Sequence, residues 1–153
     1  TGHLCMATLH ANNSNQALDR IINFFPEERR AQLLNDLSLN LKGFISQRLV
    51  PKAGAKGRVA AVEVLLNSPL ISELILRGDI HGVKEIMAKS RDIGMQTFDQ
   101  HLFELYIQGQ IEYDEALRQA VSTNDLRLRI QMHEEGNDPD RLYDRISDLN
   151  LIS

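Results

Sequence analysis

The 153-residue chain contains a single cysteine and no tryptophan. One thiol cannot form an intrachain disulfide, so a disulfide-stapled fold is excluded, and a reducing compartment is the simple inference. No stretch approaches the roughly 20 apolar residues that cross a bilayer, and no signal-peptide pattern is present. The sequence therefore predicts one domain of ordinary size, or one domain with a small appendage, whose core forms without staples.

Three common catalytic patterns are also missing. The chain has no Gly-x-x-x-x-Gly-Lys-Ser/Thr phosphate loop, no Gly-x-Ser-x-Gly elbow and no His-Glu-x-x-His zinc pair. Its formal net charge is −4, whereas a nucleic-acid-binding module usually carries a basic stripe. We therefore expect no nucleic-acid partner.

What the sequence does contain is an apolar run at its start, Thr-Gly-His-Leu-Cys-Met-Ala-Thr-Leu-His over residues 1–10. Periodicity alone leaves a buried helix segment open, but the length of the run and the break at residues 12–14 favour a strand buried on both faces, with Cys5 in the core. Ligands bind at the carboxyl ends of such strands. The pattern thus places Thr8 and His10 at a candidate ligand edge.

The two histidines of this run, His3 and His10, are poorly spaced for a shared metal ion. In an extended segment, seven steps of roughly 3.3 Å hold their backbones about 23 Å apart. In a helix they would align, but no third ligand lies nearby to complete a zinc site. We expect no metal here, and His10 taken alone is either a catalytic group or a loop histidine bonded to backbone.

The rest of the sequence predicts mainly helices. Capping residues and apolar stripes predict two helices in the first part of the chain, one after residues 13–14 and one from Pro26 to Ile45. Further helices are predicted after Ser68, Asp79 and Thr97 and over residues 112–121. A valine-rich run at 58–66 predicts a second strand, preceded by a loop at 51–57. Residues 126–132 alternate apolar and polar side chains, which leaves an edge strand or a frayed helix end open.

Glu63 stands within the apolar run at 58–66. A lone buried carboxylate is costly. The sequence therefore predicts either a cationic partner for it, such as Arg58 or Arg48, or a place at a site or subunit contact.

The last part of the chain has an acidic break at residues 134–138 and then an amphipathic pattern that starts at Pro139. Leu142, Ile146 and Leu149 form its apolar line, which predicts a short helix. We interpret residues 133–153 as an appendage that docks on a partner or on its own domain.

Several short motifs follow one another in an order that points to a known family. They are Thr1-Gly2-His3-Leu4 with Leu9-His10, Leu18-Asp19-Arg20-Ile21-Ile22, Phe25-Pro26, Ile45-Ser46-Gln47, Gly57-Arg58-Val59-Ala60-Ala61 with Glu63, and Gly94-Met95-Gln96-Thr97-Phe98-Asp99. Over roughly residues 1–132 the chain resembles the secretion and type IV pilus ATPases, in particular the pilus-retraction branch (PilT/PilU type).

Within that branch the chain resembles the accessory twitching-motility enzymes more than the main retraction enzymes. The main enzymes carry Ala-Ile-Arg-Asn-Leu-Ile-Arg, whereas residues 70–76 here read Leu-Ile-Ser-Glu-Leu-Ile-Leu. Both arginines are replaced, and the segment from His133 onward has no counterpart in the main enzymes.

The resemblance implies an α/β fold: residues 1–67 would be the C-terminal part of a RecA-like P-loop ATPase core, 68–132 a helical subdomain and 133–153 an acidic tail. The histidine motif of the family maps to His3 and His10, which are implied to sense or position the terminal phosphate. Thr8, at the expected ligand edge of the strand, is the candidate cofactor-binding residue. The implied cofactors are ATP and Mg²⁺. The implied partners are a homo-hexamer, a sister retraction ATPase and the platform protein at the cytoplasmic face of the inner membrane.

We expect the chain to be a piece of a longer polypeptide, because it begins with threonine directly before the predicted core strand and has no phosphate loop. As part of a pilus-retraction motor it would then be inactive alone. The alternative is an interaction module whose role is contact with neighbouring subunits and pilus machinery. A nucleic-acid module is a weaker third reading, which the acidic balance disfavours.

Overall fold

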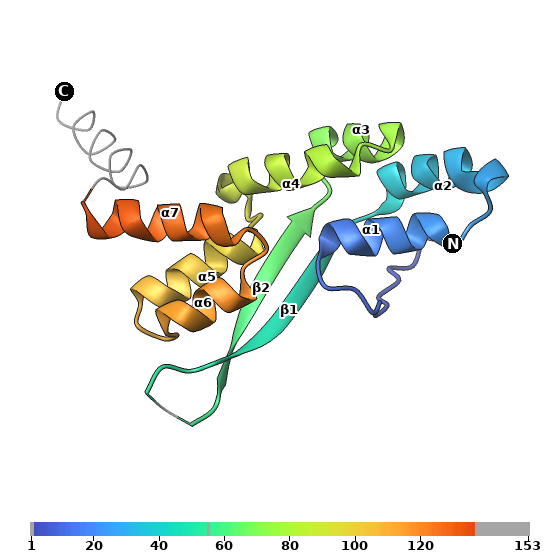
Figure 1. Cartoon of the computed structure of the whole chain (residues 1–153). Coiled ribbons are helices and arrows are strands. Elements are labelled where there is room, and N and C mark those ends of the chain that lie inside the picture. The colour runs from blue at the N-terminus through green and yellow to red at the C-terminus, as the bar shows by residue number, and fades with distance from the viewer. Residues whose placement is uncertain (1, 55, 137–153) are drawn as a thin grey trace. The chain divides into compact units, whose positions relative to one another are not determined.

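The computed structural model describes residues 2–54 and 56–136 (Figure 1). In chain order its elements are α1 (Ser14–Asn23), α2 (Glu27–Asn40), β1 (Gly43–Pro51), β2 (Arg58–Leu66), α3 (Pro69–Arg77), α4 (Ile80–Lys89), the short 3₁₀ helix η1 (Arg91–Ile93), α5 (Phe98–Ile107), α6 (Tyr113–Gln119) and α7 (Thr123–Glu134). The chain divides into two compact units, Thr1–Leu49 with Ala60–His101, and Val50–Val59 with Leu102–Ser153. Each unit is described by itself.

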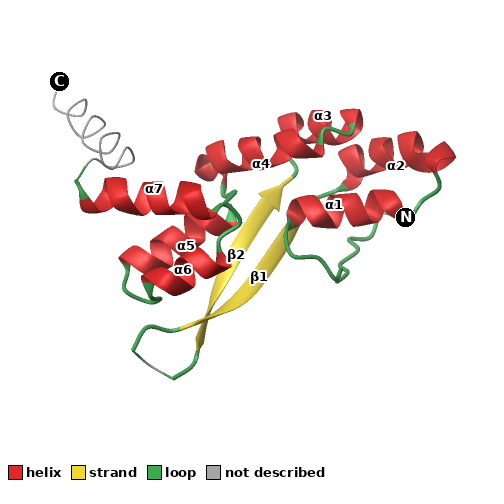
Figure 2. Ribbon diagram, viewed as in Figure 1, coloured by secondary structure: helices red, strands yellow, loops and turns green. Residues whose placement is uncertain are grey.

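The first unit contains most of β1 and β2, which form a two-stranded sheet (Figure 2). In it α2 packs against α3, and α1 packs against α4. Apolar side chains from α1, β2, α3, α4 and the loop before α5 make a continuous core: Leu18, Leu65, Ile71, Ile75, Ile80, Val83, Met87 and Met95. Burial of these stripes stabilises helices that are too short to persist alone in water.

Side-chain caps define where several helices of this unit begin. Asn13 accepts the Gln16 N–H, Ser68 accepts the Ile71 N–H and Asp79 accepts the Gly82 N–H. Thr97 and Gln100 cap α5 reciprocally: the Thr97 hydroxyl accepts the Gln100 N–H at 3.2 Å, and the Gln100 side chain accepts the Thr97 N–H at 2.9 Å. Each bond satisfies a helix-end donor that has no partner within the helix, which is why the predicted starts are confirmed.

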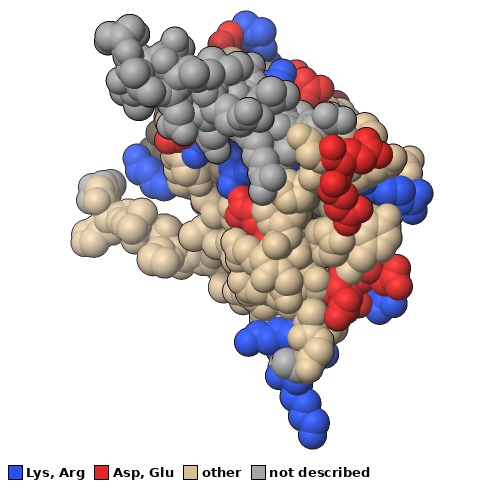
Figure 3. Space-filling model, turned by 90° about the vertical axis from the view of Figure 1, so that its left-hand side faces the viewer, with Lys and Arg blue, Asp and Glu red and all other residues tan. Residues whose placement is uncertain are grey.

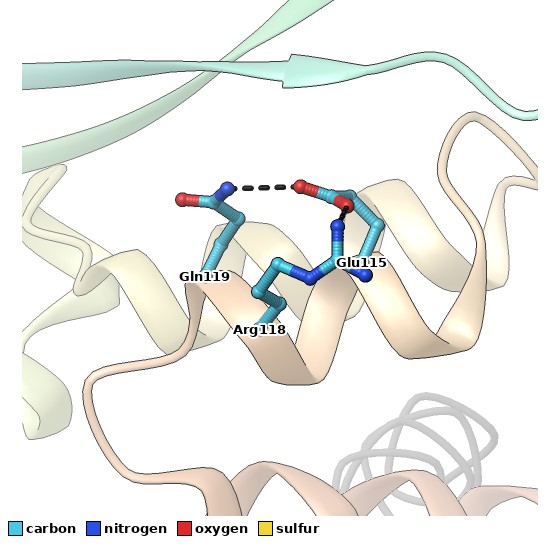
Figure 4. Close-up of polar contacts among 3 residues, drawn as sticks. All are labelled: Glu115, Arg118 and Gln119. Carbon is cyan, nitrogen blue, oxygen red and sulfur yellow. Dashed lines mark hydrogen bonds and ion pairs between the residues drawn. The ribbon is translucent and has the colours of Figure 1, made fainter.

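The second unit has a smaller core, formed where α6 packs against α7 and α5 supplies buried side chains. Leu102, Phe103, Leu105, Ile111, Ala116, Leu126 and Ile130 are buried there. The Arg129 guanidinium lies 4.6 Å from the centre of the Phe103 ring, and His133 meets the same ring edge-on at 5.4 Å. On α6, Glu115 binds Arg118 at 2.8 Å and accepts a hydrogen bond from Gln119 at 2.9 Å (Figure 4).

The predicted strand at residues 1–10 is wrong. Residues 2–11 form neither strand nor helix, and residues 2–10 are exposed, with Leu4 71% and Met6 88% accessible. Cys5 is exposed as well, so its predicted place in the core is also wrong. The physical reason is that a buried strand needs hydrogen-bonded neighbours, and the described sheet consists of β1 and β2 paired with one another.

Two other expectations along the chain need correction. The helix predicted to run to Ile45 ends at Asn40, and Phe44 and Ile45 belong to β1 instead. At that junction a Cβ on Gly43 would lie 2.5 Å from the Leu65 carbonyl oxygen, so only glycine fits this close approach of two backbones. The alternating residues at 126–132 lie in α7, so the strand alternative is wrong and the helix is confirmed.

The strand at 58–66 and its preceding loop are confirmed, as are the helices that follow Ser68, Asp79 and Thr97. The helix predicted at 112–121 is present in slightly shorter form as α6. The amphipathic helix predicted from Pro139 lies outside the described residues.

Candidate functional site

The three residues singled out by sequence, His3, Thr8 and His10, all lie on the exposed segment that precedes α1. His3 lines a surface hollow together with Gly2, Leu4 and Cys5 on one side and residues 40–43, between α2 and β1, on the other. Neither Thr8 nor His10 lines that hollow. The structure therefore brings His3 and Lys42 to one surface depression and places His10 elsewhere on the segment.

His10 lies at the centre of a tight turn. The backbone N–H of Ala11 donates to the carbonyl oxygen of Leu9 at 3.0 Å. A bond between residues two apart defines a three-residue γ-turn, with the exposed His10 side chain on its middle residue. The turn is local, so it would form without a neighbouring strand.

Directly after this turn, residues 12–15 make three hydrogen bonds to other elements of the first unit, two with side chains of β1 and β2 and one with a backbone carbonyl of α4. The Ser14 N–H donates to Glu63 Oε1 at 2.7 Å, from β2. The guanidinium of Arg48, on β1, donates to the Asn12 carbonyl at 3.3 Å. The side chain of Asn15, on α1, donates to the carbonyl of Ile80, the first residue of α4, at 2.9 Å. These bonds hold the start of α1 against the hairpin and α4.

Glu63 is only 3% exposed, so the buried carboxylate expected from the sequence is present. Its carboxylate accepts a backbone N–H of the first helical residue of α1, a partner that the sequence did not suggest. A helix N-terminus carries partial positive charge, which favours a carboxylate there. Sequence spacing could not have found this pair, because its two residues are 49 positions apart.

The side chains present fit contact with an anionic group better than they fit a metal site. Imidazole, ammonium and hydroxyl groups can donate to phosphate oxygens, and His3, Lys42, Thr8 and His10 are all exposed. Within residues 2–54 and 56–136 no three His, Cys, Asp or Glu side chains gather as a metal would need. A magnesium ion would therefore need ligands from nucleotide phosphates, water or residues outside the described part.

A sequence model of the type II/IV secretion system protein family matches residues 1–118, so the chain belongs to that family. Among curated proteins, the chain is 55% identical to the type IV pilus ATPase PilU of Pseudomonas aeruginosa over 151 residues, 99% of this chain and 39% of that protein. It is 36% identical to the retraction ATPase PilT of the same organism over 120 residues, 78% of this chain and 35% of PilT. The resemblance to the retraction branch is therefore confirmed, and identity is higher to PilU than to PilT.

The fold agrees with a solved structure of the pilus retraction motor PilT with bound ADP. The TM-score is 0.74 and the identity 37%, over 83% of this chain and 35% of that one. The expected fold, part of a secretion-ATPase domain, is confirmed. This chain spans well under half the length of the relatives it matches.

Proposed function

We propose that this chain is the C-terminal part of a nucleotide-driven motor that powers type IV pilus retraction and twitching motility by coupling ATP hydrolysis to pilus disassembly. The observation that supports it most is that the segment of residues 2–10, which carries His3, Thr8 and His10, lies within the matched residues 1–118 and is exposed to a ligand. In this proposal the chain supplies His10, His3 and Thr8 to a site whose phosphate loop lies elsewhere.

His10 is assigned to the terminal phosphate, and Thr8 to the nucleotide beside it. An imidazole N–H can donate to a phosphate oxygen and stabilise charge that develops during transfer. ATP with Mg²⁺ would supply the reacting phosphoanhydride when bound. His3 is assigned a second, supporting contact, because it and Lys42 line the same surface hollow.

The proposed assembly is a homo-hexamer that works with a sister retraction ATPase and the pilus platform protein at the cytoplasmic face of the inner membrane. Residues 1–67 would belong to the RecA-like core, 68–132 to a helical subdomain and 133–153 to a tail. No described helix has the length and apolar character needed to span a membrane.

The test measures ATP turnover by the full-length protein that carries this chain. His10→Ala is expected to lower kcat by about a hundredfold, in the range seen when a transition-state donor is removed, and His3→Ala by less. His81→Ala is the matched control, because His81 is an exposed histidine at the start of α4. This chain alone should turn over ATP no faster than its His10→Ala variant; measurable turnover above that control would contradict the proposal.

A second candidate is an interaction module. Ile45 and Leu49, on the same face of β1, are 79% and 56% exposed, and apolar groups so placed are typical of contact surfaces. Co-precipitation with the sister retraction ATPase is expected to fall for the Ile45→Ser/Leu49→Ser variant. Removal of residues 134–153 tests the tail separately; unchanged capture would exclude the tail from the contact.

A nucleic-acid partner is not proposed. On the face drawn in Figure 3, basic and acidic side chains lie in several separate groups instead of one basic stripe. A salt titration with single-stranded DNA is expected to show no binding.

A further inference from the structure

We infer that Glu63 is a positioning residue for His10, which acts by holding the first turn of α1 against β2. The last step of this inference, from His10 to ATP turnover, rests on the proposed function. The positioning itself rests on contacts within the first unit alone.

Glu63 holds the start of α1 through its hydrogen bond with Ser14. Ser14 is the first residue of α1 and is fully buried, and its N–H lies 2.7 Å from the carboxylate of the nearly buried Glu63. The first N–H groups of a helix have no acceptor within it, and a bond to a carboxylate is stronger than one to a neutral acceptor. Loss of Glu63 would leave a buried donor without its acceptor, which is costly.

A chain of hydrogen bonds connects that contact to the turn around His10. Asn13 caps α1 by accepting the Gln16 N–H at 2.8 Å, and Gln16 Oε1 accepts the Asn12 N–H at 2.6 Å. The Asn12 carbonyl is in turn held by Arg48. Each residue from Asn12 to Ser14 is thus fixed, and the γ-turn of His10 begins immediately before them.

The consequence is that His10 can be exposed and still have a defined position. An unanchored segment outside the sheet would sample many conformations, and ordering it at each catalytic cycle would cost conformational entropy. Anchoring by Glu63 removes part of that cost before a ligand binds.

The experiment measures backbone ¹⁵N order parameters in the full chain. Glu63→Ala is expected to lower the values at His10 and Ala11 from roughly 0.85 toward 0.6, while Val83 and Met87 in the core of α4 keep theirs. Glu63→Gln keeps an oxygen acceptor and is expected to restore most of the order. Glu27→Ala is the matched control, because Glu27 is an exposed carboxylate in the first turn of α2.

Unchanged order at His10 and Ala11 in Glu63→Ala would overturn the inference. A loss of order that extends equally to Val83 and Met87 would show general loosening and would also count against it.

A second pair of variants removes the donor instead of the acceptor. Ser14→Pro abolishes the N–H at a position where helices tolerate proline, and it should reproduce the loss of order at His10. Ser14→Ala keeps the N–H and removes only a hydroxyl that has no hydrogen-bond partner within the described part of the chain, so it should behave as wild type. Wild-type order in Ser14→Pro would overturn the inference.

In the full-length protein, Glu63→Gln is expected to lower kcat less than Glu63→Ala, with KM for ATP unchanged in both. If the wild-type full-length protein fails to hydrolyse ATP, the proposed function fails, while the order parameters still decide whether Glu63 positions His10.

Discussion

Val64 and Gln96 exchange both backbone hydrogen bonds, at 2.9 and 3.0 Å, and so form an antiparallel bridge at the edge of β2. The Gln96 side chain adds a third bond by donating to the Val62 carbonyl at 2.8 Å. Gln96 therefore pairs with β2 at a single position, directly before Thr97, which caps α5. An edge strand that would otherwise expose unpaired backbone groups is covered there.

Gln96→Ala is expected to lower the free energy of unfolding by about 1 kcal/mol, because it removes the bond to Val62 and leaves the backbone bridge in place. Urea unfolding of the full chain measures the change. Gln47→Ala is the control, since Gln47 is an exposed glutamine on the paired strand β1. Equal losses in the two variants would show that the bond to Val62 contributes nothing.

His101 accepts the Val62 N–H at its Nδ1 atom, at 2.8 Å, so its ring proton is assigned to Nε2. His101→Leu leaves that N–H without its acceptor and should cost about 1–2 kcal/mol, whereas His81→Leu, at an exposed position, should cost less than about 0.5 kcal/mol. Imidazole ¹⁵N shifts provide an independent check. A His101 ring protonated at Nδ1 would contradict the assignment.

Asn67 closes the end of α2. Its side-chain amide donates to the carbonyls of Ser38 and Leu41, both at 2.9 Å, and its oxygen accepts the Ser72 hydroxyl at 3.0 Å. Asn67→Ala should lower the free energy of unfolding by about 2 kcal/mol. Asn40→Ala is the control: it removes a single exposed hydrogen bond to Asp36 and should lower the free energy of unfolding by about 0.5 kcal/mol or less. Equal losses for Asn67→Ala and Asn40→Ala would contradict the stabilising role of the Asn67 bonds.

Tyr106 gives the second unit a dependence on alkaline pH. Its hydroxyl donates to Glu134 at 2.8 Å, and this bond, followed by burial and the charge of Glu134, raises the pKa of Tyr106 above 10.0. The folded state therefore holds the phenol proton more tightly than the unfolded state. The resulting stability is fully present below the ordinary tyrosine pKa of about 10 and is lost as the pH rises through the higher folded-state value.

Tyr106→Phe should accordingly lower the free energy of unfolding by about 0.5 kcal/mol at neutral pH, since the site is close to solvent. The difference from wild type should shrink above about pH 10. Urea midpoints measured across that range test this. A difference that stayed constant with pH would exclude the proposed linkage.

The helices could be predicted because their signals are local. A capping side chain accepts the backbone N–H of the residue three positions later at Ser68, Asp79 and Thr97. The residues that fix each helix start are therefore close together in the sequence. The valine-rich β2 was predictable for the same kind of reason, since its composition favours a strand.

The opening segment and Glu63 could not be predicted in this way, because their environments depend on distant parts of the chain. An apolar run indicates burial only where a neighbouring strand is supplied, and residues 2–10 have none among the described elements. Glu63 was expected to be buried and is, but its partner at Ser14 depends on how α1 folds back over the hairpin. The family pattern singled out His3 and His10. The predicted strand end singled out Thr8 and His10, and that strand is absent. The roles of all three residues stay a proposal.

The exposed thiol of Cys5 has a practical consequence, because it is the chain's one cysteine. Oxidation in air can join two copies of this chain through that sulfur and can go no further, so a non-reducing gel should show a dimer and no higher ladder. The same sulfur atom is a single site for attaching a dye, between His3 and His10 and seven residues before Asn12, without prior mutagenesis.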